Sequence, residues 1–181
     1  LNFLLNEQQD QAIDSFIEAV QHDPETSELH FALGNLFRRR GEYDRAVRVH
    51  EHLLARSDLS NADRQRAQHG LAMDFLKAGL LDRAEGAFRK LENTPFATEA
   101  QLALLAIFER SRDWEKAIEI AKRLESGEQG SFRVRRAHYH CELADVALQA
   151  GQTDTAMAAL EQAIQLAPES PRAYLAISAL Q

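Results

Sequence analysis

Apolar residues recur along the chain at steps of three and four, which is the spacing of one face of an α-helix. The clearest runs begin at an alanine and continue over the next two turns, as in Ala84, Phe88 and Leu91. Before such an alanine stands a leucine followed by Gly or Ala, with an aromatic residue four positions after the leucine. Leu71 and Phe75 are one example. The pattern predicts helices arranged in pairs.

The predicted pairs repeat, because five segments share a turn, a polar residue and then an alanine. These alanines are Ala12, Ala46, Ala84, Ala117 and Ala156. Successive alanines are 34, 38, 33 and 39 residues apart, which scatters about the ~34 residues of a tetratricopeptide unit. The two longer intervals place insertions near Ser57–Asp63 and Ser126–Arg133, in polar stretches between pairs where a longer loop costs little.

One pair cannot bury its own apolar faces, so each is expected to stack on the next. We predict an all-α fold, a right-handed α-solenoid of tetratricopeptide-type helix pairs that forms a single array over residues 1–181. The predicted units are 1–25 (a partial first), 26–60, 61–96, 97–130, 131–169 and 170–181, the last being the first helix of a truncated sixth unit.

Small residues at the repeat register are expected to let two helices approach closely. Ala84→Leu would then overpack this contact and cost about 1–3 kcal/mol. Gly41, Gly79 and Gly151 fall in the bends within pairs, where a residue at positive φ ends the first helix. In the fourth unit Arg112-Asp113 stands where this glycine is expected, beside Trp114, which we interpret as an anchor between pairs.

Composition narrows the classes of function. The formal net charge is −7, which argues against general attraction to nucleic acid or acidic lipid. No apolar run approaches the roughly 18 residues that would span a membrane. Cys141 is the only cysteine, so an intrachain disulfide is excluded and a cytosolic setting fits best. The chain opens with Leu1 and stops within a helical pattern, which suggests a piece of a longer protein.

Several segments carry a narrower likeness. They are Asn2–Leu5, Leu33–Arg38, Asp44–Ala46, Ala78–Leu80, Asp82–Glu85, Lys116–Ile118, Ala137-His138 and Cys141–Ala144. Together they resemble the lipopolysaccharide assembly protein B family, tetratricopeptide proteins of the Gram-negative inner membrane. The resemblance implies a membrane helix before Leu1, repeats on the cytoplasmic side, and a rubredoxin-like ribbon holding iron or zinc beyond Gln181. It implies no cofactor within these residues.

The resemblance also implies a function. Members act as adaptors that help a membrane-anchored AAA protease degrade the deacetylase of the lipid A pathway, and proteins of lipopolysaccharide transport or synthesis are further expected partners. The alternative is a structural scaffold that assembles envelope enzymes, or a self-association module such as a homodimer, without substrate delivery. The sequence offers no converging set of titratable groups, so we do not expect an enzyme.

The first helix of each tetratricopeptide pair lines the concave groove, so its inward residues are the binding candidates. Counting from the repeat register gives Phe31, Asn35, Arg38, Arg39, Arg66, His69, Met73, Lys77 and Arg110. These cations favour an acidic or amphipathic partner segment; the simpler interpretation is a solvated helix face. Reversing Arg38, Arg39 and Lys77 to Glu is expected to weaken binding while leaving the fold intact. Asn35 suggests a carboxylate clamp, but Phe31 stands where such a clamp needs a donor.

Two His-x-His pairs and the lone cysteine raise the question of metal binding or catalysis. Side chains two apart on a helix point away from each other, so neither His50 with His52 nor His138 with His140 can chelate a metal from one face. Cys141 follows His140 directly, and adjacent helical side chains diverge. We therefore predict no metal site and no catalytic residue.

Overall fold

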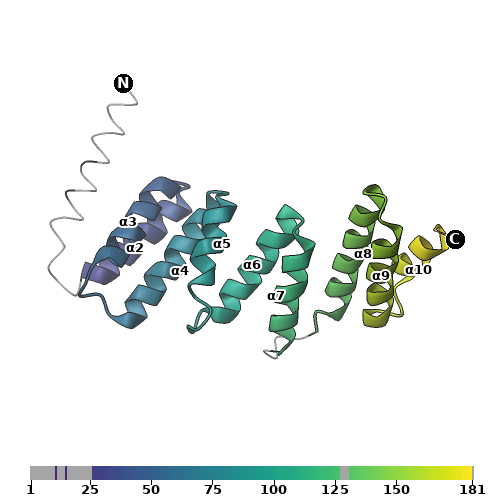
Figure 1. Cartoon of the computed structure of the whole chain (residues 1–181). Coiled ribbons are helices and arrows are strands. Elements are labelled where there is room, and N and C mark those ends of the chain that lie inside the picture. Colours follow the sequence, from purple (N-terminus) through teal and green to yellow (C-terminus); the bar gives the residue numbers. More distant parts are fainter. Residues whose placement is uncertain (1–10, 12–14, 16–25, 127–130, 181) are drawn as a thin grey trace, which may run out of the picture. The chain divides into compact units, whose positions relative to one another are not determined.

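The structure is a computed structural model that describes residues 11, 15, 26–126 and 131–180 (Figure 1). Its helices are α2 (Thr26–Arg39), α3 (Tyr43–Ala55), α4 (Asn61–Lys77), α5 (Leu81–Arg89), α6 (Ala97–Ser111), α7 (Trp114–Ser126), α8 (Arg133–Gln149), α9 (Thr153–Leu166) and α10 (Pro171–Ser178). All regular elements in these ranges are helical, which confirms the predicted all-α class. Ala12 and most of the predicted first unit lie outside the described residues.

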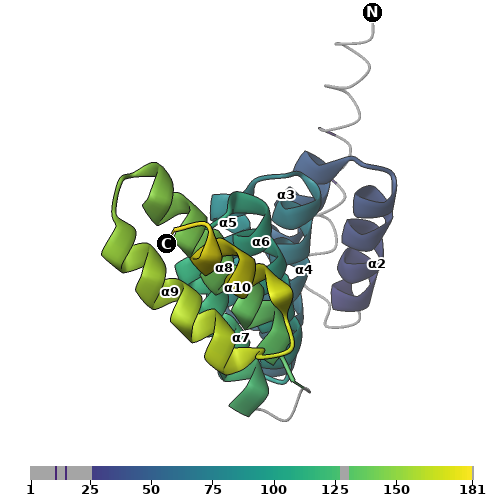
Figure 2. The same cartoon turned by 90° about the vertical axis from the view of Figure 1, so that its right-hand side faces the viewer.

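The chain divides into two compact units, Leu1–Ala100 and Gln101–Gln181. In the first, α2 packs on α3, α3 on α4, and α4 on α5. In the second, α7 packs on α8, α8 on α9, and α9 on α10; Figure 2 shows α9 and α10 side by side. Helix α6 begins in the first unit and continues in the second. No helix of the described ranges is long and apolar enough to cross a membrane.

The turns within pairs share one hydrogen-bond pattern. The residue before each second helix donates its N–H to the carbonyl five positions back, as from Glu42 to Phe37 and from Leu80 to Phe75, both at 2.9 Å. This is the Schellman end of a helix, which needs one residue in the left-handed region. Gly41, Gly79 and Gly151 supply it with φ between 73° and 77°. The predicted role of these glycines is confirmed.

The α6–α7 turn closes in the same way without a glycine. Asp113 donates its N–H to the carbonyl of Phe108 at 2.9 Å, and Arg112 takes the left-handed position with φ of 57°. A side chain with a Cβ is strained in this region. The repeat therefore determines the conformation of this turn, and the left-handed backbone of Arg112 costs conformational free energy.

The alanines that set the register occupy equivalent places. Ala46, Ala84, Ala117 and Ala156 are each 0% exposed, as expected for contacts where two helices approach closely. The residue four positions later is also buried in each described unit, for example Phe88 and Leu160. The observed environments confirm the register on which the predicted repeat depends.

The anchor role of Trp114 is also confirmed. Its side chain at the start of α7 is buried and stacks on the ring of Tyr139 in α8, with 5.8 Å between centroids and 18° between planes. The ring of His138 meets Trp114 edge-on. An aromatic stack of this kind joins one helix pair to the next within the second unit.

Candidate protein-binding surface

In the first unit, charged side chains join neighbouring first helices. Arg66 of α4 donates hydrogen bonds to Glu28 of α2 from both terminal guanidinium nitrogens, Nη1 and Nη2, the second at 3.2 Å. Arg38 of α2 pairs with Asp74 of α4 at 2.8 Å. His69 of α4 lies 3.2 Å from a carboxylate oxygen of Glu99, at the start of α6. Several of the side chains predicted to bind a partner are thus paired with carboxylates of the same unit.

The second unit has a similar arrangement. Arg135 of α8 donates to Glu109 of α6 at 2.7 Å, and the hydroxyl of Tyr139 donates to the same carboxylate. Burial, together with the hydrogen bond to Glu109, raises the pKa of Tyr139 well above its ordinary value. Arg172 of α10 reaches Glu142 at 2.7 Å on α8. Ion pairs therefore also link first helices in this unit.

Phe31 does not lie on an accessible groove, which corrects the prediction from the register. It is 2% exposed and belongs to a core cluster with Leu53 and Ala67. The guanidinium of Arg66 lies 4.0 Å from the centre of its ring. The cation and its pair with Glu28 cover the ring, so Phe31 contributes to packing.

Arg38 and Asn35 are tied to each other and to α4. The side-chain oxygen of Asn35 accepts a hydrogen bond from Arg38, which also donates to the Gly70 carbonyl at 3.1 Å and to Asp74. Glu in place of Arg38 would set a carboxylate against the fully buried Asp74. The structure therefore changes our prediction, and we now expect this reversal to destabilise the fold, because the buried charge of Asp74 would lose its partner.

The remaining candidates differ in accessibility. Met73 and His69 are half-buried, and the His69 ring stacks on Phe96 with 4.7 Å between centroids. Arg39, Lys77 and Arg110 are exposed, and none of them forms an ion pair with another described residue. Arg39 and Lys77 end neighbouring helices of the first unit, whereas Arg110 belongs to the second.

A buried polar cluster at the centre of the first unit is the main feature that the sequence prediction missed. The imidazole of His50 in α3 lies 2.5 Å from a carboxylate oxygen of Asp74, and both side chains are almost fully buried. The other carboxylate oxygen holds Arg38. The cluster connects the interior of α3 to the exposed side of α2.

Two glycines make room for His50. A Cβ at Gly34 would lie 2.6 Å from the imidazole Cε1, and a Cβ at Gly70 would lie 2.5 Å from Nε2. The repeat itself carries a signal for this cluster. His50 and Asp74 stand at register positions that hold Phe88 and Ile107 in other units. Polar residues at repeat positions that are otherwise apolar indicate a specific interaction.

The other described histidines and Cys141 are not grouped as the ligands of a metal ion. Among the residues that the structure describes, no group of three His, Cys, Asp or Glu side chains could hold a metal ion. Cys141 is buried, and burial raises the pKa of its thiol, which disfavours the thiolate that binds metals. The residues present therefore do not fit an iron or zinc ribbon.

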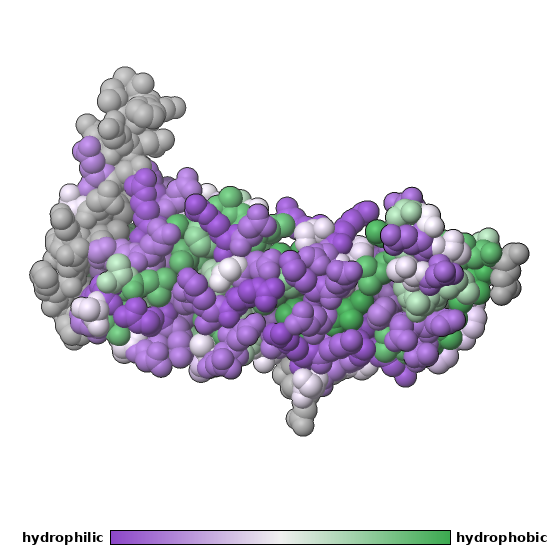
Figure 3. Space-filling view, viewed as in Figure 1, coloured by the Kyte–Doolittle hydropathy of each residue, from purple (hydrophilic) through white to green (hydrophobic). Residues whose placement is uncertain are grey.

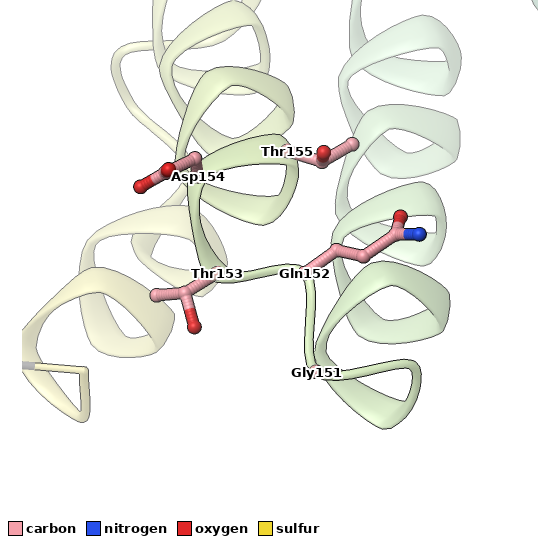
Figure 4. Close-up of a pocket in the computed structure, with 5 residues that line it drawn as sticks. All are labelled: Gly151, Gln152, Thr153, Asp154 and Thr155. Carbon is pink, nitrogen blue, oxygen red and sulfur yellow. The ribbon is translucent and has the colours of Figure 1, made fainter.

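Two shallow hollows lie at equivalent turns of the repeat. One is lined by Gly79–Arg83 at the α4–α5 turn and the other by Gly151–Thr155 at the α8–α9 turn. In Figure 4 the side chains of Gln152, Thr153 and Asp154 point in different directions from the second turn. Because these groups do not converge, the hollow has no arrangement suited to catalysis.

Comparison with known proteins agrees with this architecture. Family models described as tetratricopeptide repeat match residues 29–65, 69–131 and 142–180. The crystal structure of YrrB, described as a tetratricopeptide protein with an unusual peptide-binding site, covers 98% of this chain and 88% of its own, with 17% identity and a TM-score of 0.50. The chain has the fold of a tetratricopeptide solenoid, a class of protein-binding scaffolds.

Curated relatives define the family within that class. Lipopolysaccharide assembly protein B of Escherichia coli strain K12 is 42% identical over 90% of this chain and 42% of its own length. The protein of the same name from Haemophilus influenzae is 32% identical over 99% of the chain and 48% of its own length. The chain belongs to the lipopolysaccharide assembly protein B family, and it spans less than half of these relatives.

Proposed function

We propose that this chain is the protein-binding array of an adaptor that regulates lipopolysaccharide synthesis. In this account it brings the deacetylase of the lipid A pathway to a membrane-anchored AAA protease, on the cytoplasmic side of the inner membrane. The observation that carries the proposal is the 42% identity to lipopolysaccharide assembly protein B over 90% of the chain. The array acts by binding and carries out no catalysis of its own.

The charges of the first unit support a binding role. Arg39 and Lys77 are exposed at the ends of α2 and α4, and these helices are held together by the contacts of Arg38 with Gly70 and Asp74. Two cations on a fixed frame attract an acidic segment of a partner and orient its approach. The C-terminal ends of α2 and α4 thus form one positively charged site on a protein whose net charge is −7.

The test uses the full-length parent protein. Purified parent is expected to retain both the deacetylase and the protease in a pull-down, and deletion of its gene is expected to lengthen the half-life of the deacetylase in cells. Absence of binding to both proteins, together with an unchanged half-life, would contradict the adaptor function.

A scaffold that assembles envelope enzymes is the second candidate, because the relatives are named as assembly proteins. It makes a different prediction for the same experiments. Envelope enzymes would then co-purify with the parent in fixed ratios, while the half-life of the deacetylase would not depend on the gene. Metal in the purified parent would be assigned to residues beyond Gln181.

A further inference from the structure

The α4–α5 turn exposes an apolar side chain at a repeat position that is polar elsewhere. Leu80 is 43% exposed, whereas Glu42, Asp113 and Gln152 occupy the equivalent place in the other described turns. A leucine at this position often packs against the helix that it ends. Here its exposed area shows that this packing is incomplete.

Arg83 lies at the same turn as Leu80. The guanidinium carbon of Arg83 lies 5.6 Å from the centre of the Phe75 ring. Leu80 and Arg83 both line the open hollow at this turn. An exposed leucine beside an open hollow offers a contact for one apolar side chain of a partner.

Three cations lie near this contact, and one carboxylate, the exposed Asp82, also lines the hollow, so the local balance of charge is positive. Lys77 precedes Leu80 by three residues and Arg83 follows it by three, and neither forms an ion pair with another described residue. Arg39 lies at the same end of the neighbouring helix, since the adjacent Arg38 binds Asp74 one turn before Lys77. We call Arg39, Lys77, Leu80 and Arg83 the turn surface.

We propose that the turn surface binds an acidic protein segment that carries an apolar side chain. The cations attract the acidic residues and raise the rate of encounter, while the apolar side chain enters the hollow beside Leu80. This proposal rests on the proposed function in that the partner is a protein. It adds the site and the chemistry of the segment, and it does not require that the segment belong to the deacetylase.

A lipid surface fits the turn surface less well. A bilayer would contact the α2–α3 turn of the same unit together with the α4–α5 turn, and the first of these carries Glu42 and Asp44. Acidic groups are repelled by anionic headgroups. In Figure 3 the visible face is largely hydrophilic, with hydrophobic residues in separate patches. A single apolar contact beside cations suits a peptide.

The experiment measures binding of a fluorescent peptide of alternating Glu and Leu to the full chain. Leu80→Gln, which introduces the residue found in the α8–α9 turn, is expected to weaken binding about tenfold. Lys77→Gln is expected to weaken binding and to reduce its dependence on salt. Leu175→Gln is the matched control, because Leu175 is more exposed at 69% but lies on α10 in the other unit. Thermal melting of each variant verifies the fold.

Three further probes separate the outcomes. A peptide with Lys in place of Glu, and one with Ala in place of Leu, should each bind more weakly than the first. Equal effects of Leu80→Gln and Leu175→Gln on peptide binding would overturn the proposal. It would also be overturned if Leu80→Gln weakened binding to phosphatidylglycerol vesicles but not binding to the peptide. Peptide binding at Leu80 combined with an unchanged deacetylase half-life on gene deletion would retain the turn surface and reject the proposed adaptor function.

Discussion

Three glycines of the first unit lie within helices, but only two of them lie against another side chain. Gly34 and Gly70 leave room for the ring of His50 between α2 and α4, and Asp74 fixes that ring. Gly86 lies within α5, and a Cβ built there meets nothing within 4 Å. Only the first two glycines are therefore required by packing.

Substitution by alanine is expected to separate the two cases. Gly70→Ala should lower the free energy of unfolding by about 1–3 kcal/mol, because the new methyl group overlaps an imidazole that cannot move away. Gly86→Ala should raise it by about 0.5–1 kcal/mol, the gain in helix propensity at an open site. Urea unfolding measures both. Stabilisation by Gly70→Ala would show that His50 is free to shift.

The left-handed residue of the α6–α7 turn gives a second prediction at this scale. Arg112 has φ of 57° and is exposed, so its side chain adds strain without a burial gain. Arg112→Gly is expected to stabilise the chain by about 1 kcal/mol, since glycine adopts this conformation without the steric penalty. The melting temperature would rise. A lower melting temperature would mean that the arginine makes a compensating interaction.

Single residues also show how far the sequence could predict this structure. The buried alanines and the turn glycines follow from the repeat, because each satisfies a steric need that recurs in every pair. The cluster of His50, Asp74 and Arg38 does not recur, so the repeat register alone could not place it. Counting register positions likewise predicted that Phe31 lines the groove, but the guanidinium of Arg66 lies over its ring. The register does not give the direction of the Arg66 side chain.

Contacts between helix pairs determine the stability of individual elements. Trp114 at the start of α7 is buried and stacks on Tyr139 of α8. Trp114→Ala is expected to cost about 3–5 kcal/mol, as for removal of a buried aromatic side chain. Denaturant unfolding checks this value. A loss of only a few tenths of a kcal/mol would contradict the anchor role.

The contact between α2 and α3 is expected to be sensitive to acid. The rings of His30 and His52 stack with 5.8 Å between centroids, and burial, followed by the charges of His30 and Arg56, lowers the pKa of His52 below its usual 6.5. The folded state thus binds fewer protons than the unfolded state once the pH falls below about 6.5. The free energy of unfolding should be constant above this pH. It should decrease as the pH falls from about 6.5 through the lowered pKa of His52.

A variant isolates the contribution of His52. His52→Gln is expected to reduce the loss of stability between about pH 7.5 and about pH 5.5, because one group with a lowered pKa is removed. His140 retains part of the effect, since its pKa is also lowered by burial and by the charges of Lys122 and Arg136. An equal loss in wild type and variant would assign the acid sensitivity to other groups.

For the whole molecule, the central claim is that the array binds a protein partner through exposed charge on its first helices. Ion pairs within the array use several cations that the register had assigned to binding, and among the predicted positions in the first unit Arg39 and Lys77 are the exposed cations without an ion pair to a described residue. The proposed class of partner is inferred from the similarity to lipopolysaccharide assembly protein B more than from composition. A net charge of −7 would not by itself predict binding of an acidic segment.

The most direct test is the affinity of the full-length parent for the deacetylase after reversal of Arg39 and Lys77 to Glu. Lys90 and Lys122, which are exposed outside the first helices, provide a control reversal with the same change in net charge. We expect the first variant to bind about tenfold more weakly, with an unchanged melting temperature, and the control to bind like wild type. Equal affinities for both variants and the wild type would contradict the account.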